Sequence, residues 1–515
     1  FNFNLIPSNI AVRADLDRQF IRTQLWNDNL TTIGIEPQFE KFFNFRRTYN
    51  LRWNLTKSLS IDYDARANAV IDEPEGDLNT EEKRDSVINN LKNFGRLKNF
   101  DQNITATYRI PLDKFPVTSW IRADLRYSAG YSWTARAIEQ QDTLGNTLQN
   151  SRDQSISTKF DMVALYNKVP FLKNINSPPR SARRGGRGGR SSRVQPQQEQ
   201  DSTKTKAELK GLKGVLRLLM SVRSIDFNYS QREGTVLPGF NRTPQFFGMD
   251  DAWSAPGWDF ILGSQNPDIR QEAASRDWLA RSPFQSDFFT QSRTETINIR
   301  AQLEPVKDLR IQLDAKKTNT ANYLESFLFL SDSAGFQSLS PSRSGQYNIS
   351  FNAIRTAFTK ENSDGTSPVF EQFIENRAII AQQLNEQLGL DSLFGRNSQD
   401  VLIPAFAAAY SGKDAAEADL TPFPKIPLPN WRVDYAGLSK IKALSEVFSS
   451  INITHGYSSS YDVSNFNNSL QYTDGLTVNN NITDYPIGTD TNDNGQVVPV
   501  YLLTQVTIRE QFAPL

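Results

Sequence analysis

Hydrophobic and polar residues alternate along residues 43–69 of this chain. Odd positions from 43 to 55 are apolar or aromatic except Arg47, and even positions are polar or charged. The pattern resumes after a turn at Lys57 and Ser58. Because successive side chains of a strand point to opposite faces, it predicts a β-hairpin with one apolar and one charged face. Long, tightly joined strands of this kind are typical of outer-membrane β-barrels.

Similar runs recur along the rest of the chain, and most exceed the ~9–11 residues that a tilted strand needs to cross the hydrocarbon of a membrane. The predicted spanning strands are 10–26, 43–56, 58–70, 101–112, 117–135, 153–166, 217–231, 293–304, 308–320, 429–438, 449–463 and 500–512. Short connections such as 57–58 and 305–307 alternate with long ones such as 71–100. Barrels place short turns in the periplasm and long loops outside the cell.

We therefore predict an all-β fold that forms part of a large transmembrane antiparallel β-barrel, with long outer loops and a small helical insertion. Apolar residues at helical spacing predict a helix at 368–388, which opens at Ser367–Pro368 and closes at Gly389. If 345–353 crossed the membrane as a single strand, the Lys-rich turn at 439–448 would lie on the outer side. We therefore place 321–428 wholly outside, with a hairpin of its own near 345–353. The predicted segments are 1–166 (barrel strands and outer loops), 167–216 (a periplasmic-side, basic Gly/Arg-rich linker), 217–320 (barrel strands with an aromatic outer loop at 232–292), 321–428 (a partly helical, cap-like outer insertion) and 429–515 (barrel strands).

Composition removes several classes of function. The 515 residues include no cysteine and one histidine, His455, so disulfides, thiolate metal sites and histidine triads are excluded. Lysine plus arginine equals aspartate plus glutamate at 57 each, which gives no indication of nucleic-acid binding. No phosphate loop or nucleophile motif is present. We assign no catalytic, cofactor-binding or metal-ligating residue and predict neither an enzyme nor a cofactor. We interpret His455, on the apolar face, as a hydrogen-bonded structural residue.

The two faces of the predicted strands supply the candidate functional residues. We predict that the charged face lines the lumen, with Arg52, Asp62, Asp64, Arg66, Arg109, Arg122, Asp124, Arg126, Arg300 and Asp314. We predict that the apolar face meets lipid, with Leu51, Trp53, Leu55, Ile61, Leu125, Tyr127, Ile299 and Ile311. The charged set fits a wide, wet channel for a bulky passenger. It equally fits charges that pair across strands inside a plugged barrel.

Two further segments also have alternative interpretations. The tract at 183–190 alternates arginine with glycine as some RNA-binding segments do, but it lacks interleaved aromatic residues and is better interpreted as a solvated linker. Loop 232–292 is rich in aromatic residues and prolines. It either docks a partner or forms a lid, or it packs on itself, which we favour.

Several phrases of the sequence resemble the SprA/Sov family of Bacteroidota. They are FPKIPLPNWRVDYAGLSK at Phe423–Lys440, INITHGY at Ile451–Tyr457, IPSNI at Ile6–Ile10, VRSIDFNY at Val222–Tyr229, LPG at Leu237–Gly239 and REQFAP at Arg509–Pro514. The similarity runs through most of the 515 residues. The Arg/Gly tract is not one of the family's motifs.

The resemblance implies a very large outer-membrane barrel of which this chain is a late portion. It implies the translocon of the type IX secretion system, a protein-conducting channel that exports folded cargo bearing a C-terminal sorting domain to the cell surface and is linked to gliding motility. The implied partners are that cargo, a PorV-like shuttle barrel beside a lateral opening, a plug protein, the lipid bilayer and lipopolysaccharide, and no nucleic acid. Long loops are expected to be extracellular and short turns periplasmic. A large porin or nutrient-transporter barrel and a cell-surface β-rich adhesin remain the alternatives.

Overall fold

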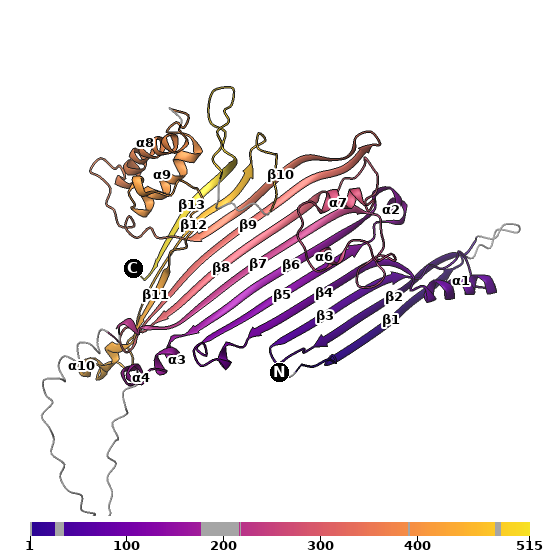
Figure 1. The fold of residues 1–515 in the computed structure, drawn as a ribbon, viewed down its shortest axis with the longest axis horizontal. Helices are drawn as coiled ribbons and strands as arrows, with labels where there is room; N and C mark the ends of the chain where they lie inside the picture. Colours follow the sequence, from indigo (N-terminus) through magenta and orange to yellow (C-terminus); the bar gives the residue numbers. More distant parts are fainter. Residues whose placement is uncertain are drawn as a thin grey trace, which may run out of the picture.

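A computed structural model describes residues 3–25, 36–176, 216, 218–389, 392–478 and 486–514. One antiparallel sheet of thirteen strands dominates it (Figure 1). The strands are β1 Asn9–Thr23, β2 Gln38–Trp53, β3 Leu59–Val70, β4 Arg96–Ile110, β5 Ile121–Thr134, β6 Asn146–Asp161, β7 Val222–Phe240, β8 Phe289–Leu303, β9 Leu309–Ser331, β10 Gly335–Ser350, β11 Asn430–Tyr435, β12 Ile453–Asn468 and β13 Tyr501–Ala513. The predicted antiparallel β-sheet is thereby confirmed.

Helices lie at both ends of the strands, and most of them are short. They are α1 Glu81–Lys92, α2 Ile138–Leu144, α3 Met162–Asn167, α4 Pro170–Asn176, α6 Trp258–Ile261, α7 Ile269–Ser275, α8 Pro368–Leu388, α9 Gln399–Ser411 and α10 Lys442–Ser445. Helices α3, α4 and α10 lie at one end of the sheet, here called the turn end, and α1, α2, α6 and α7 lie at the opposite, loop end (Figure 1). Within the ranges described, no helix is both long and apolar enough to cross a membrane.

The strands follow one another in chain order from β1 to β9, so each hairpin is built from sequence neighbours. Every predicted strand overlaps an observed one, because period-two alternation is a strong signal when a strand is long. Several strands extend further toward the loop end than the alternation indicates: β7 reaches Phe240 and β9 reaches Ser331. The aromatic loop predicted at 232–292 is therefore reduced to residues 241–288.

One predicted strand ends five residues before its predicted limit. Strand β6 stops at Asp161 instead of continuing to residue 166, and helix α3 follows. The Asp161 carboxylate accepts a hydrogen bond of 2.9 Å from the Ala164 backbone N–H, which is the usual way in which an aspartate caps a helix. The linker predicted at 167–216 therefore begins in helices α3 and α4. Its Arg/Gly tract lies outside the described residues.

The segment predicted as an outer insertion differs from expectation. Strand β10 pairs with β9 and β12, so the β9–β10 hairpin belongs to the main sheet. Strand β11 pairs with the same two neighbours nearer the turn end, for example Asn430 opposite Asp314. The two short strands together occupy one position in the sheet, and residues 351–429 leave and rejoin it between them. The separate hairpin near 345–353 was wrong, because a strand that stops halfway across the sheet looks like an isolated one in the sequence.

The helical part of that segment matches the prediction. Helix α8 spans Pro368–Leu388 and ends at Gly389 in the left-handed conformation with φ 66°. Ile380 and Leu384 of α8 pack against Val401 and Ala405 of α9, and all four are fully buried. These two helices form a small unit with a core of its own beside β12 and β13 (Figure 1).

Candidate functional site

The ten residues of the predicted lumen set lie on one face of the sheet, here called the charged face. Directly opposed residues of neighbouring antiparallel strands share a face. Arg52 lies opposite Asp62 in β2–β3, and Arg300 lies opposite Asp314 in β8–β9. The strand pairings between them show that both pairs lie on the same face. The members between them follow the same register: Asp64, Arg66, Arg109, Arg122, Asp124 and Arg126.

Some of these charges pair and others do not. Arg52 Nε lies 2.7 Å from Asp62 Oδ1, and Arg300 Nε lies 2.7 Å from Asp314 Oδ1. Asp64 accepts a hydrogen bond from the Asn50 amide. The other five form no side-chain hydrogen bond or ion pair with any residue that the structure describes, and all five are exposed: Arg66, Arg109, Arg122, Asp124 and Arg126. The arrangement is a wet surface of mixed charge with a few cross-strand pairs.

The predicted lipid set lies on the opposite face, here called the apolar face. Its eight members are partly exposed, and none is buried: Leu51, Trp53, Leu55, Ile61, Leu125, Tyr127, Ile299 and Ile311. Register links them across the sheet, as with Leu125 opposite Ile156 and Trp53 opposite Ile61. Near the turn end of β2 to β9 this face is thus an apolar surface that the described residues leave partly exposed.

On several strands the apolar surface ends at the same distance from the turn end. On four strands, the first charged residue of the apolar face stands eight residues from an apolar residue at the turn end. The pairs are Leu55 and Arg47 on the β2 side, Phe160 and Arg152 on β6, Ile225 and Glu233 on β7, and Leu309 and Lys317 on β9. At about 3.3 Å per residue, eight steps cover about 26 Å of strand. We call this surface the apolar band.

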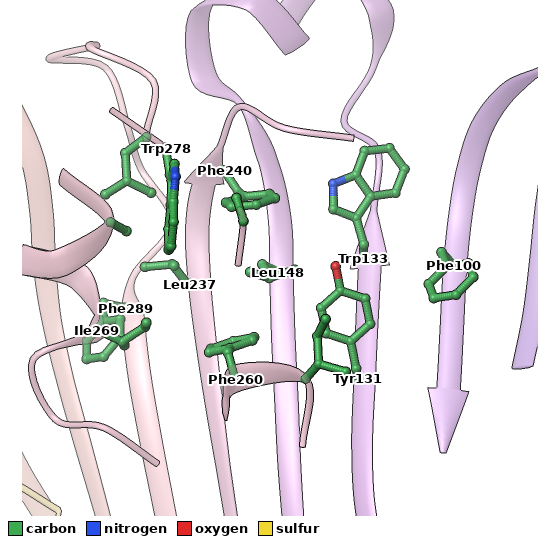
Figure 2. Packing of buried hydrophobic residues seen from close by; sticks show 14 of the residues in the cluster. Phe100, Tyr131, Trp133, Leu148, Leu237, Phe240, Phe260, Ile269, Trp278 and Phe289 are labelled. Carbon is green, nitrogen blue, oxygen red and sulfur yellow. The ribbon is translucent and has the colours of Figure 1, made fainter. Parts of the chain in front are cut away.

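Beyond the band, the loop 241–288 covers the apolar face. Phe260 and Trp278 from the loop are nearly fully buried against Trp133, Leu148 and Leu237 of strands β5, β6 and β7 (Figure 2). The Trp133 indole donates to the backbone carbonyl of residue 242 at 3.0 Å. The loop thus packs both on the sheet and on itself, while several of its aromatic side chains stay at least half exposed: Phe246, Phe247 and Phe284.

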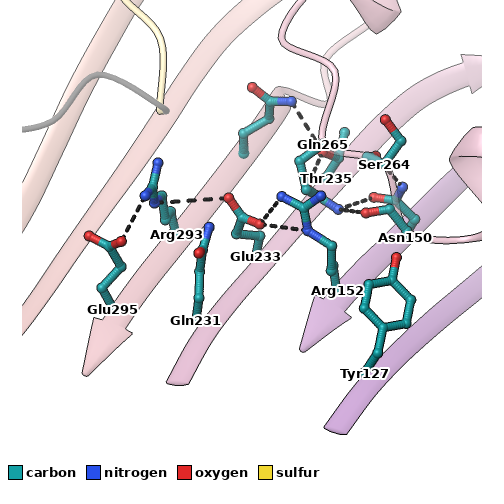
Figure 3. Close-up of polar contacts among 12 residues, drawn as sticks. Tyr127, Asn150, Arg152, Gln231, Glu233, Thr235, Ser264, Gln265, Arg293 and Glu295 are labelled. Atoms are coloured by element: carbon teal, nitrogen blue, oxygen red, sulfur yellow. Dashed lines mark hydrogen bonds and ion pairs between the residues drawn. The ribbon is translucent and has the colours of Figure 1, made fainter. Parts of the chain in front are cut away.

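A polar network marks the boundary between the band and the covered region (Figure 3). The buried Glu233 carboxylate accepts a hydrogen bond of 2.8 Å from Arg152 Nε on β6 and lies 3.9 Å from Arg293 Nε on β8. Arg293 also donates to Glu295 at 2.7 Å. The buried Glu233 carboxylate requires such pairing, because an isolated buried charge is costly.

The same network ties the loop to the sheet through neutral groups. The Asn150 amide donates to the carbonyl oxygens of Phe260 and Ser264 at 2.9 and 2.8 Å, and Gln265 donates to the Asn150 side-chain oxygen at 2.9 Å. Thr235 on β7 donates to Gln265 at 2.8 Å. These residues were missed from the sequence. The available signal was the run of polar side chains at apolar-face positions in the loop-end halves of β6, β7 and β8.

An aspartate braces the loop internally. Asp250 accepts hydrogen bonds from the backbone N–H groups of Ser254 at 2.7 Å and Ala255 at 3.1 Å. Burial by itself would raise the pKa of the Asp250 carboxyl, but the two N–H donors stabilise its charged form and hold the pKa below its ordinary value. The carboxylate is therefore charged, and it fixes this turn of the loop at neutral pH.

The remaining candidates are structural. His455 Nδ1 lies 3.2 Å from the Pro514 carbonyl oxygen, which fits its interpretation as a hydrogen-bonded residue. Among the residues placed in the structure, no group of three or more histidine, cysteine or acidic side chains is arranged to hold a metal ion. No protein-family model matches this chain, and no similar protein was found among curated proteins.

Proposed function

We propose that this chain forms part of the wall of an outer-membrane β-barrel that conducts proteins. The apolar band faces lipid, and the charged face lines a water-filled passage. The observation that carries the proposal is the constant eight-residue width of the band on β2, β6, β7 and β9. With the charged residue at its end included, each span has nine positions, which matches the ~9–11 residues with which a tilted strand crosses the hydrocarbon.

The two ends of the sheet support this orientation. Short connections close the turn end at 54–58 and 304–308, whereas the loop end carries the covered region with loop 241–288 and the insertion 351–429. Outer-membrane barrels have short periplasmic turns and long extracellular loops. The proposed localisation is therefore the outer membrane, with the turn end in the periplasm.

The charged face supports a wide passage. Its charges are of both signs, and the five unpaired members, four arginines and one aspartate, are exposed to solvent. A wet surface of this kind suits a folded protein with its own mixed surface charge. Together with the resemblance to the SprA/Sov family, this favours type IX secretion. Cargo with a C-terminal sorting domain would pass along this face, and a PorV-like shuttle barrel and a plug protein would act beside and beneath it.

Two adjacent positions on β5 test the proposal. A photo-crosslinking amino acid replaces Arg126 on the charged face or Leu125 on the apolar face of the full-length protein in its native outer membrane. We expect secreted proteins to be captured from position 126 and lipid from position 125. A transporter would give lipid at position 125 without secreted protein at position 126. An adhesin would give no lipid at either position.

A further inference from the structure

An apolar groove of about 390 Å³ opens on the apolar face between strands β1–β4 and the tip of loop 241–288. Its walls include Ile10 and Val12 of β1, Leu51 of β2 and Tyr63 of β3, and its rim is formed by Phe246 and Phe247. The volume lies within the range of about 300–1,000 Å³ that is typical of ligand sites. The groove is continuous with the apolar band, which Leu51 also lines.

The rim of this groove is a fixed turn. Phe247 and Gly248 both have positive φ, 55° and 84°, and Phe246 bridges to Met249. Two strand side chains hold the turn: the Gln102 amide donates to the Phe247 carbonyl at 3.0 Å, and the Tyr131 hydroxyl donates to the Gly248 carbonyl at 2.9 Å. A phenylalanine at positive φ is strained and persists only where the surroundings impose it.

The mouth of the groove carries a positive charge without an acidic partner. Arg47 is the charged residue that interrupts the odd-position pattern of β2, and it lines the groove at the upper limit of the band. Its guanidinium carbon lies 4.6 Å from the Phe94 ring and 5.5 Å from the Phe45 ring. With the rest of the described chain it makes no hydrogen bond or ion pair. Arg47 stands four residues, about 13 Å, from Leu51 along the strand.

We propose that this groove binds one acyl chain of an anionic membrane lipid, with Arg47 bound to the phosphate of the headgroup. An apolar wall that ends in an arginine complements an amphiphile with one apolar chain and one negative end. Arginine binds phosphate through charge-assisted hydrogen bonds. The level of Arg47 at the edge of the apolar band is the level expected for a headgroup. This inference rests on the proposed function, because it requires that the band faces lipid.

Fluorescence quenching by brominated lipids tests the site, since the 515 residues contain no native cysteine. Ala14, which is exposed and lies opposite Arg47, is replaced by cysteine in the full-length protein and labelled with a small fluorophore. Ile156→Cys, on the same face but away from the groove and in the middle of the band, is the reference position. Both are reconstituted in phosphatidylcholine that contains phosphatidylglycerol, with either lipid brominated at positions from the headgroup end to the middle of one chain.

We expect brominated phosphatidylglycerol to quench the label at position 14 at about a tenfold lower mole fraction than brominated phosphatidylcholine does, without such a preference at position 156. Arg47→Gln should abolish the preference, and Arg126→Gln on the charged face should leave it unchanged. Equal quenching by both lipids at position 14, or no quenching there beside normal quenching at position 156, overturns the lipid site alone. Quenching at neither position overturns the membrane orientation as well.

Discussion

Ile156 and Ser157 are neighbours on β6 that face opposite sides of the sheet, and both are exposed. Ile156 is 40 % exposed and lies four residues from Phe160 and four from Arg152, in the middle of the apolar band. Ser157 lies opposite Asp124 on the charged face. Replacing each by arginine places the same cation at the same height on the two faces.

The two substitutions are expected to differ by several kilocalories per mole. An arginine on the lipid face near the bilayer midplane costs ~2–4 kcal/mol. In water, an exposed substitution usually stays within about 0.5 kcal/mol. Ile156→Arg should therefore lower the folding equilibrium constant by roughly thirtyfold or more. Ser157→Arg should have little effect, because it gains Asp124 as a partner and loses one hydrogen bond to Asn228.

Urea titration of the full-length protein in lipid vesicles, followed by tryptophan fluorescence, measures the free energy of unfolding of both variants. The level of each folded variant in isolated outer membranes provides a second measurement. The reasoning is refuted if both substitutions cost less than about 0.5 kcal/mol, since the band would then face water. It is also refuted if Ser157→Arg is the more costly of the two.

Three further predictions concern the covered region. Glu233→Gln removes the buried charge that pairs with the partly buried Arg152, and it should lower the free energy of unfolding by about 2–3 kcal/mol in the same titration, because a charge-assisted hydrogen bond is lost. Gly248→Ala should cost about 1–3 kcal/mol and expose loop 241–288 to limited proteolysis, because the φ of 84° is strained for alanine and the new Cβ would lie 2.8 Å from the Tyr131 ring; an unchanged cleavage rate would contradict this. The folded-state pKa of Asp250 is lowered, so its stabilisation of the loop is fully present above the unfolded pKa of about 3.9 and is lost as pH falls through the lower folded value. Amide exchange at residues 250–255 should therefore be slow and constant, after correction for the intrinsic rate, from pH 8 to about pH 5, and Asp250→Asn should accelerate it throughout that range.

The strands of the sheet are largely predictable from the sequence, because each one buries or exposes a whole face and therefore alternates over many residues. The pairing of Arg52 with Asp62 is less predictable, because a two-residue turn at Lys57 and Ser58 would place Arg52 opposite Tyr63, one residue away from the observed register. Helix α8 is predictable because its apolar stripe is bounded by a proline and a glycine.

The covered region is much less predictable, because its contacts are not local. Asn150 bonds to loop residues more than a hundred positions away, and no local pattern specifies that partner. Arg152 and Glu233 interrupt the apolar face in two different strands, and their pairing follows only when the β6–β7 register is known. Strands β10 and β11 both lie between β9 and β12, and each spans only part of that position in the sheet. Because β11 has only six residues, alternation alone cannot show that the two segments share this position.

Imaging the full-length protein, purified from outer membranes in mild detergent, would show whether the sheet is part of a barrel wall. We expect a closed, wide barrel in which this thirteen-stranded sheet forms part of the wall. Arg126 and Arg300 would face the lumen, the apolar band would lie within the detergent belt, and secreted protein or a companion barrel would be attached. A structure in which Leu51 and Leu125 pack against a second protein sheet, with no detergent around them, would contradict it.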